Sequence, residues 1–543
     1  MSSQPAQASS SSRAQQVLTS TTPASDLSPF ELKDLLIKAA SSDTHRLMLN
    51  AGRGNPNFLA TQPRHAFLRL GEFALRESER SYSYLDSGFG GLPKEAGLVD
   101  RFEVYASGHD HDEGVAFLRA AISYVDDQLG IDAESFLAEA VTAFLGCQYP
   151  VPPRMLPNAE RIVARYLRQQ MTGDRPTGDF AVFATEGGTA AMTYLFESLF
   201  ANELLHPGDK IAIGTPIFSP YLEIPILPGY DLEVVDIRMD QDHQWQYPQD
   251  ELDKLLDPAV KVFCLVNPSN PPSTKLSDAS LRTIAELIQS RRPDLIVITD
   301  DVYGTFADDF TSLFALAPRN TVLVYSFSKF FGATGWRLGT IALHEDNTID
   351  AALAAQPDEI RDRLRTRYSS LTEDASTLGF IDRLVADSRA VALNHTAGLS
   401  LPQQLQMTLF ALHALTDRLG RYQTAAKSLI RHREATLYAS AGIPVYDAPE
   451  DVDYYTLVDL QRLAGQLYGQ DFAAWFEKKD LGRDFLFRLA RETGVVLLPG
   501  NGFEVVDASA RVSLANLTEA EYVSIGRFTR TVLDEYHADY IAG

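Results

Sequence analysis

The chain has 543 residues, of which 72 are acidic and 48 are basic, and its formal net charge is −24. This length suffices for a large core and more than one domain, while the acidic surface argues against nucleic acid or an anionic membrane as a partner. The sequence contains no uncharged apolar stretch of about 18 residues, so no membrane span is expected. Its two cysteines, Cys147 and Cys264, form neither a disulfide framework nor a metal-ligand pattern.

The N-terminal part is predicted to combine a tail with loops that reach the active site. Residues 1–28 are rich in Ser, Gln, Thr and Ala and lack the apolar core of a secretory signal. This composition predicts a disordered tail on a cytoplasmic protein. Residues 29–95 contain helical stretches and two Gly-rich loops, which begin at Asn50 and at Tyr84. We assign this segment partly to a small domain and partly to active-site loops.

The middle of the chain has the pattern of a sheet wrapped by helices. Residues 96–172 are predicted to form a helical insertion. In residues 173–345, short apolar runs alternate with helical stretches, which is typical of a mainly parallel sheet in an α/β domain. A helical segment follows at residues 346–435, and residues 436–543 are predicted to form a smaller α+β domain. The expected strands of the large domain are residues 180–184, 210–214, 260–266, 295–299 and 322–325.

Unusual residues gather at the predicted strand ends, where open α/β sheets bind their ligands. After the first strand, Gly187, Gly188 and Thr189 precede a helix, whose free N–H groups suit a phosphate. A tight turn alone would have the same sequence. After the third strand, the neighbouring prolines can hold Asn270 toward a ligand, although an ordinary proline loop is an equal interpretation.

Two charged residues follow the next two strands. Asp300 directly follows a buried strand, where its carboxylate needs a cationic partner, a helix N-cap or a salt bridge. Lys329 lies between serines and aromatic residues, which remove its solvation and favour a neutral, nucleophilic amine over a buried structural lysine. Arg337 can return to a bound anion with its fork of donors.

The order and spacing of these residues resemble a known family. The string S-F-S-K-x7-R-x-G around Lys329 is similar to the signature of fold-type I, aspartate-aminotransferase-like enzymes that use pyridoxal 5′-phosphate (PLP). The pair Asp300 and Tyr303, with an upstream Asn-Pro-Ser-Asn-Pro run, matches the same family in the same order. The resemblance implies a large domain with a mostly parallel seven-stranded sheet, a smaller α+β domain and a homodimer as the active unit.

The resemblance also implies a role for each matched residue. Lys329 would form the Schiff base with PLP, Asp300 would pair with the pyridinium nitrogen, and Arg511 would bind the substrate α-carboxylate. The other implied contacts are Asn270 and Tyr303 at the phenolic oxygen, Phe218 on the ring, Gly187, Gly188, Thr189, Ser326 and Arg337 at the phosphate, and Tyr84, in competition with Tyr82, at the neighbouring subunit's phosphate.

Length, the added helical segments and the string A-G-R-G-N-P-N-F resemble the L-aspartate β-decarboxylase (aspartate 4-decarboxylase) subfamily. That resemblance implies conversion of L-aspartate into L-alanine and CO2, secondary transamination with 2-oxo acids, and dimers assembled further, for example into a dodecamer. Arg53 is expected to contact the distal carboxylate, with Gly54, Asn270 and Arg511 also binding substrate.

Some features depart from the family or leave alternatives open. The family usually has Thr-Gly after Asn-Pro, whereas Pro272 and Ser273 follow here. The pair Tyr454 and Tyr455 is interpreted as strand packing. A plain aminotransferase on aspartate or another amino acid, and a non-catalytic PLP-binding regulator, are the competing functions, and no metal is expected.

Overall fold

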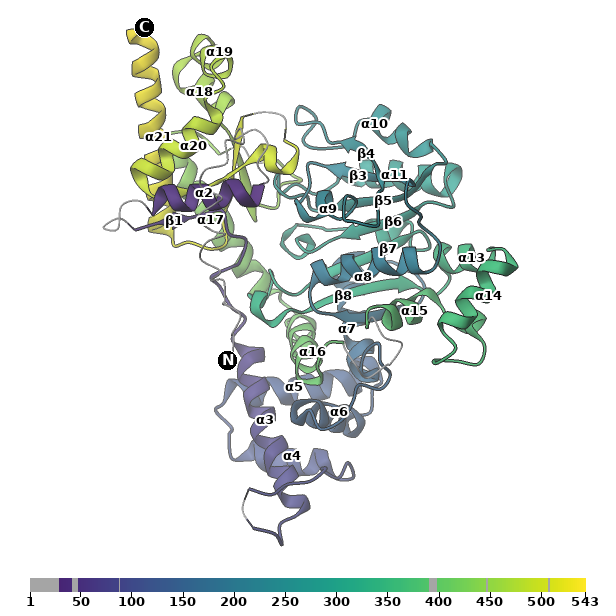
Figure 1. Cartoon of the computed structure of the whole chain (residues 1–543). Helices are drawn as coiled ribbons and strands as arrows, with labels where there is room; N and C mark the ends of the chain where they lie inside the picture. Colours follow the sequence, from purple (N-terminus) through teal and green to yellow (C-terminus); the bar gives the residue numbers. More distant parts are fainter. Residues whose placement is uncertain (1–28, 42–46, 87, 390–397, 446–447, 506–507) are drawn as a thin grey trace, which may run out of the picture.

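The computed structural model describes residues 29–41, 47–86, 88–389, 398–445, 448–505 and 508–543. The predicted tail, residues 1–28, lies outside the described residues. The described part contains a large sheet with flanking helices, a smaller mixed domain and a group of helices (Figure 1). None of its helices combines the length and the apolar character that a membrane crossing needs.

The central sheet has seven strands in the order β2-β8-β7-β6-β5-β3-β4. The strands from β7 to β4 in this order are parallel, whereas β8 is antiparallel to both β2 and β7. The expected mostly parallel, seven-stranded sheet is therefore confirmed. Its strands are β2 (Phe180–Thr185), β3 (Lys210–Thr215), β4 (Glu233–Arg238), β5 (Val260–Val266), β6 (Ile296–Asp300), β7 (Thr321–Ser326) and β8 (Gly339–His344).

Helices cover both faces of this sheet because its central strands are apolar on both faces. Adjacent residues of β6 show this: Val297 belongs to one cluster of buried apolar side chains and Ile298 to another. The helices of this domain are α8 (Gly188–Ala201), α9 (Pro220–Glu223), α10 (Gln249–Asp253), α11 (Asp278–Arg291), α12 (Leu313–Leu316), α13 (Thr348–Ala354), α14 (Asp358–Arg367) and α15 (Phe380–Asp387).

The smaller domain joins the two ends of the chain. Its three-stranded antiparallel sheet has the order β11-β12-β9, and β1 from the N-terminal segment pairs in parallel with β10. The strands are β1 (Leu49–Asn50), β9 (Tyr455–Asp459), β10 (Val495–Val496), β11 (Leu498–Pro499) and β12 (Ser509–Ser513). The helices around them are α2 (Pro29–Ala40), α17 (Arg421–Ala441), α18 (Leu460–Tyr468), α19 (Gln470–Lys478), α20 (Leu481–Thr493) and α21 (Glu519–Ala542).

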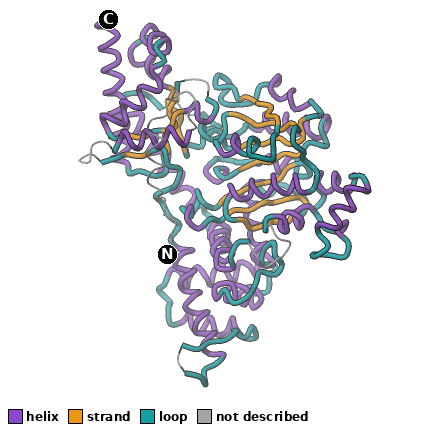
Figure 2. Tube along the Cα trace, in the orientation of Figure 1, coloured by secondary structure: helices purple, strands orange, loops and turns teal. Residues whose placement is uncertain are grey.

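A third group contains helices only and forms the lower part of the molecule in Figures 1 and 2. Helix α16 packs against α3, α5, α6 and α7, and local signals fix the helix ends. The Asp112 carboxylate accepts hydrogen bonds from two N–H groups at the start of α5, which ends before the left-handed Gly130. The helices are α3 (Gln62–Ser81), α4 (Leu98–Ser107), α5 (Glu113–Leu129), α6 (Ala133–Leu145), α7 (Pro157–Thr172) and α16 (Leu401–Thr416).

Candidate active site

Lys329 lies in the turn directly after β7, where it faces the N-terminal Gly-rich loop. Its Nζ donates a hydrogen bond of 2.9 Å to the carbonyl oxygen of Gly54. The hydroxyl of Tyr454, just before β9, donates to the same carbonyl at 2.9 Å. The large domain, the small domain and the N-terminal loop therefore meet at the predicted Schiff-base lysine.

Asp300 ends β6 and lies close enough to Lys329 for their charges to interact. Its carboxylate accepts hydrogen bonds from the Tyr221 hydroxyl at 2.7 Å and from the Val302 N–H at 3.2 Å. Burial raises the pKa of the Asp300 carboxyl, while Tyr221, Val302 and the charge of Lys329 oppose this increase. The carboxylate thus has two neutral donors and would gain from a bound cation such as a protonated pyridine nitrogen.

Tyr221 was not identified from the sequence. It lies on the short helix α9 after β3, and its side chain is 5% exposed. The available signal is its place three residues after Phe218, in the same irregular segment. Phe218 itself is half-buried, and its carbonyl accepts the N–H of Tyr221.

Arg511, on β12, is 3% exposed, and its guanidinium is held by hydrogen bonds that leave one nitrogen available for a ligand. One Nη donates to the Asn270 side-chain oxygen at 2.9 Å and the other to the Gly52 carbonyl at 2.8 Å, while Nε is buried without a partner among the described residues. The guanidinium carbon also lies 4.2 Å from the centre of the Tyr455 ring. A fixed, desolvated fork of this kind fits a substrate carboxylate.

Tyr454, just before β9, and Tyr455, the first residue of β9, contribute hydroxyl groups to the candidate site in addition to packing against each other. Their rings contact each other at 5.1 Å, as strand packing predicts. However, the Tyr455 hydroxyl also lies 2.9 Å from the Tyr303 hydroxyl, and that of Tyr454 contacts Gly54. Both hydroxyls therefore belong to the candidate site, which the sequence-based interpretation as strand packing did not include.

A cradle for an anion forms where α8 begins beside the end of β7. Gly187 has a φ of 99°, and a methyl group added there would collide with the guanidinium of Arg337. A methyl group added to Gly188 would lie 3.7 Å from the Ser326 Cβ, and the Ser326 hydroxyl donates to that of Ser328 at 2.9 Å. The N–H groups of a helix start, an arginine and two hydroxyls are what a phosphate group requires.

Three predicted residues have no described contact with this cluster within one subunit. Thr189, in the first turn of α8, and Arg53, between the two anchored glycines, are exposed. Tyr84 is 77% exposed in the loop after α3, and its ring contacts that of Tyr82 at 5.9 Å. The roles of these residues remain predictions.

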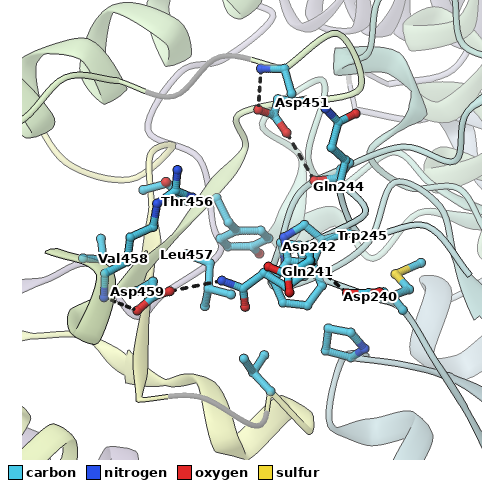
Figure 3. Close-up of a pocket in the computed structure, with 18 of the residues that line it drawn as sticks. Asp240, Gln241, Asp242, Gln244, Trp245, Asp451, Thr456, Leu457, Val458 and Asp459 are labelled. Carbon is cyan, nitrogen blue, oxygen red and sulfur yellow. Dashed lines mark hydrogen bonds between the residues drawn. The ribbon is translucent and has the colours of Figure 1, made fainter. Parts of the chain in front are cut away.

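A large cleft adjoins the site and shares Tyr455 with it. It has a volume of about 960 Å³ and lies between β9 and residues 238–251 of the large domain. In Figure 3, the Gln241 side chain points to Asp459, to which it donates at 3.1 Å, and Asp240, Asp242 and Asp451 line the same cleft. These carboxylates repel anions, so a substrate carboxylate suits this cleft less well than it suits Arg511, and substrate binding beside Lys329 and Arg511 stays the prediction.

Comparisons with known proteins agree with this geometry. The family model described as aminotransferase class I and II matches residues 150–524. A bifunctional aspartate aminotransferase and L-aspartate β-decarboxylase from a Pseudomonas species is 57% identical over 518 residues, which cover 95% of this chain and 98% of that protein. An aspartate aminotransferase from Pyrococcus abyssi is 33% identical over 146 residues, or 26% of this chain and 36% of that protein.

Solved structures support the fold alone. An aspartate aminotransferase from Thermus thermophilus with maleate has a TM-score of 0.56 at 17% identity, covering 97% of this chain and 100% of that chain. An aromatic aminotransferase from Pyrococcus horikoshii has a TM-score of 0.55 at 18% identity, covering 92% and 99%.

Fold and site together define a PLP-dependent enzyme of the class I and II aminotransferase type. Within this class, the chain belongs to the family of the bifunctional aspartate aminotransferase and L-aspartate β-decarboxylase. The resemblance inferred from the motifs is therefore confirmed, as is the dependence on PLP.

Proposed function

We propose that this chain converts L-aspartate into L-alanine and CO2, with aspartate transamination as a secondary activity. The observation that carries the proposal is the anchoring of the loop around Arg53. The carbonyl of Gly52 accepts from Arg511, and the carbonyl of Gly54 accepts from Lys329. The backbone of Arg53 is thus held between the predicted α-carboxylate ligand and the reactive lysine, as a substrate with a second carboxylate requires.

PLP and the residues of this chain would supply different parts of the chemistry. When bound, PLP supplies an electron sink for electrons released at the substrate carbons. Asp300 and its donor Tyr221 would hold the cationic ring nitrogen, and the cradle at Gly187 would hold the phosphate. Lys329 would bind the cofactor at rest and, once free, would remove the Cα proton and later restore a proton to Cα, while the carbon that loses CO2 gains one further proton that comes ultimately from solvent.

Arg511 and Arg53 would bind the two ends of aspartate differently. Arg511 is buried and fixed by Asn270 and Gly52, so it suits the α-carboxylate, which is retained. Arg53 is exposed, so its side chain can change position. A rigid ion pair with the β-carboxylate would stabilise the ground state and oppose loss of CO2. We therefore propose that the Arg53 contact weakens along the reaction.

The test is product analysis of the purified, PLP-loaded chain with L-aspartate, in the presence and absence of 2-oxoglutarate. Alanine and CO2 formed in equal amounts without any 2-oxo acid support the proposal. Oxaloacetate and glutamate formed only with 2-oxoglutarate would leave a plain aminotransferase. A bound cofactor whose spectrum does not respond to aspartate would point to a non-catalytic PLP-binding protein.

The proposed function includes a homodimer as the active unit, assembled further into a larger oligomer such as a dodecamer. The exposed loop with Tyr84 supports a contact beyond one subunit, since its aromatic side chains are left uncovered in a single chain. Sedimentation analysis of wild-type and Tyr84→Ser protein tests this contact, because loss of the loop's contact would shift the oligomer toward smaller species. The cytoplasm is the compartment we propose.

A further inference from the structure

Tyr455 occupies a central place among the polar groups of the site. It begins β9, its side chain is 3% exposed, and its hydroxyl lies 2.9 Å from that of Tyr303. Its ring lies under the guanidinium of Arg511 at 4.2 Å. The small domain therefore presents one buried phenol to groups that come from three other segments of the chain.

The reactive lysine is one of these groups. A methyl group added to Gly54 would collide with the Tyr455 hydroxyl and lie 3.2 Å from the Lys329 Nζ. The hydroxyl and the amine thus face the same small space beside Gly54. Within the described residues, the charged and titratable groups that face Tyr455 are Lys329 after β7, Arg511 on β12, Tyr303 after β6 and Tyr454 before it in the chain.

We propose that Tyr455 is a positioning residue that acts through Lys329, with which its hydroxyl exchanges a proton during turnover. This inference rests on the proposed function, because Lys329 needs a proton partner where it moves protons. In each exchange, the O–H bond of Tyr455 breaks as an N–H bond of Lys329 forms, or the reverse, and nothing else moves.

The electrostatics of the site support this exchange. Burial acts to raise the pKa of the Tyr455 phenol, but the positive charges of Lys329 and Arg511, together with the hydrogen bond to Tyr303, lower this pKa below its ordinary value. A phenol that ionises more easily than usual can lend its proton to an amine nearby. Two groups coupled in this way titrate as a pair, so removing one must change the titration of the other.

The first test is an ultraviolet titration of the tyrosines in the full-length chain after removal of the cofactor. We expect one tyrosine to ionise below about pH 10, the ordinary value, and this transition to be absent in Tyr455→Phe. Tyr247→Phe is the matched control, because Tyr247 is buried, its hydroxyl has no hydrogen-bond partner in the described part of the chain, and burial raises its pKa. Tyr247→Phe should keep the low transition.

The decisive variant is Lys329→Ala, which leaves Tyr455 in place. Loss of the neighbouring charge should raise the midpoint of the low transition toward higher pH, because the charge of Lys329 is one of the causes that lower the pKa of Tyr455. An unchanged midpoint would overturn the proposal even if Tyr455→Phe did not fold. These titrations need no turnover, so they remain decisive if the chain proves to be a plain aminotransferase.

The second test uses the PLP-loaded enzyme. Tyr455→Phe should displace the pH profile of kcat for aspartate, whereas a purely structural role would lower kcat equally at every pH. Cofactor content and the thermal unfolding midpoint serve as controls for folding. A pH profile that coincides with that of the wild type after scaling would contradict the proposed exchange.

Discussion

Arg511→Lys tests whether the guanidinium fork, and not only its charge, binds the substrate. The arginine donates to Asn270 and Gly52 with its two Nη atoms, and its Nε finds no partner among the residues that the structure describes. A lysine has one nitrogen, so it cannot hold the loop and bind a carboxylate with two parallel hydrogen bonds. Each hydrogen bond to a charged group contributes about 1.5–3 kcal/mol. Loss of one such bond predicts a 10- to 150-fold lower kcat/KM, at about 1.4 kcal/mol for each tenfold change.

The assay is steady-state release of alanine from aspartate, together with the rate of the transamination half-reaction. Both rates should fall by the same factor, because every amino acid substrate carries an α-carboxylate. Arg292→Lys is the control: Arg292 is also buried, but it donates to the backbone carbonyls of Asp257, just before β5, and of Val260, its first residue, at the opposite edge of the sheet. It should lower the unfolding midpoint and leave kcat/KM unchanged. A loss under threefold in Arg511→Lys would refute the reasoning.

Three further substitutions probe the cradle, the core and the loop. Gly187→Ala brings a methyl group onto the Arg337 guanidinium and should weaken PLP binding, measured by fluorescence titration, by about tenfold or more. Burial raises the pKa of Asp301 to about 7, so its contribution to stability is complete below about pH 4 and is lost as the pH rises through 7. Asp301→Asn should therefore gain unfolding temperature relative to the wild type between pH 5 and pH 8. Gly54→Ala brings a methyl group onto the Tyr455 hydroxyl and should lower aspartate turnover by about 100-fold.

Control substitutions at two other glycines separate the effect of a steric collision of the added methyl group from the effect of backbone strain. Gly208 has a φ of 89° and open space around it, so Gly208→Ala should leave PLP affinity unchanged. Gly108, at the end of α4, meets only an ordinary contact at 3.5 Å, so Gly108→Ala should leave turnover unchanged. Equal losses in Gly187→Ala and Gly208→Ala, or in Gly54→Ala and Gly108→Ala, would contradict the geometric account. A pH-independent difference for Asp301→Asn would contradict the electrostatic one.

The sequence predicted the parts of the fold that depend on local pattern. All five expected strands of the large domain lie within one or two residues of observed strands. The strands β4 and β8 were not identified. β4 is an edge strand, largely exposed, and its charged residues dilute the apolar pattern. β8 directly follows the motif around Arg337, and its antiparallel direction depends on pairing with β2 and β7, which lie far apart in the sequence.

The candidate site shows the same difference between features that depend on local sequence pattern and features that depend on contacts between distant segments. The positions of Lys329, Asp300 and the glycines at the start of α8 could be predicted because they lie at strand ends, which a parallel sheet brings to one edge, while their roles stay predictions. Tyr221 and Tyr455 could not, because their contacts with Asp300 and Tyr303 join segments 79 and 152 residues apart. No spacing rule in one sequence relates such pairs.

The hydrogen bond between Gly54 and Lys329 also connects the small domain to the large domain. The loop before Gly54 belongs to the small domain, since β1 pairs with β10 and the Ala51 carbonyl accepts the Ser513 N–H at 2.8 Å. Lys329 belongs to the large domain. A rotation of one domain against the other therefore changes the geometry of this bond, so domain motion reaches the Lys329 amine, the predicted Schiff-base group.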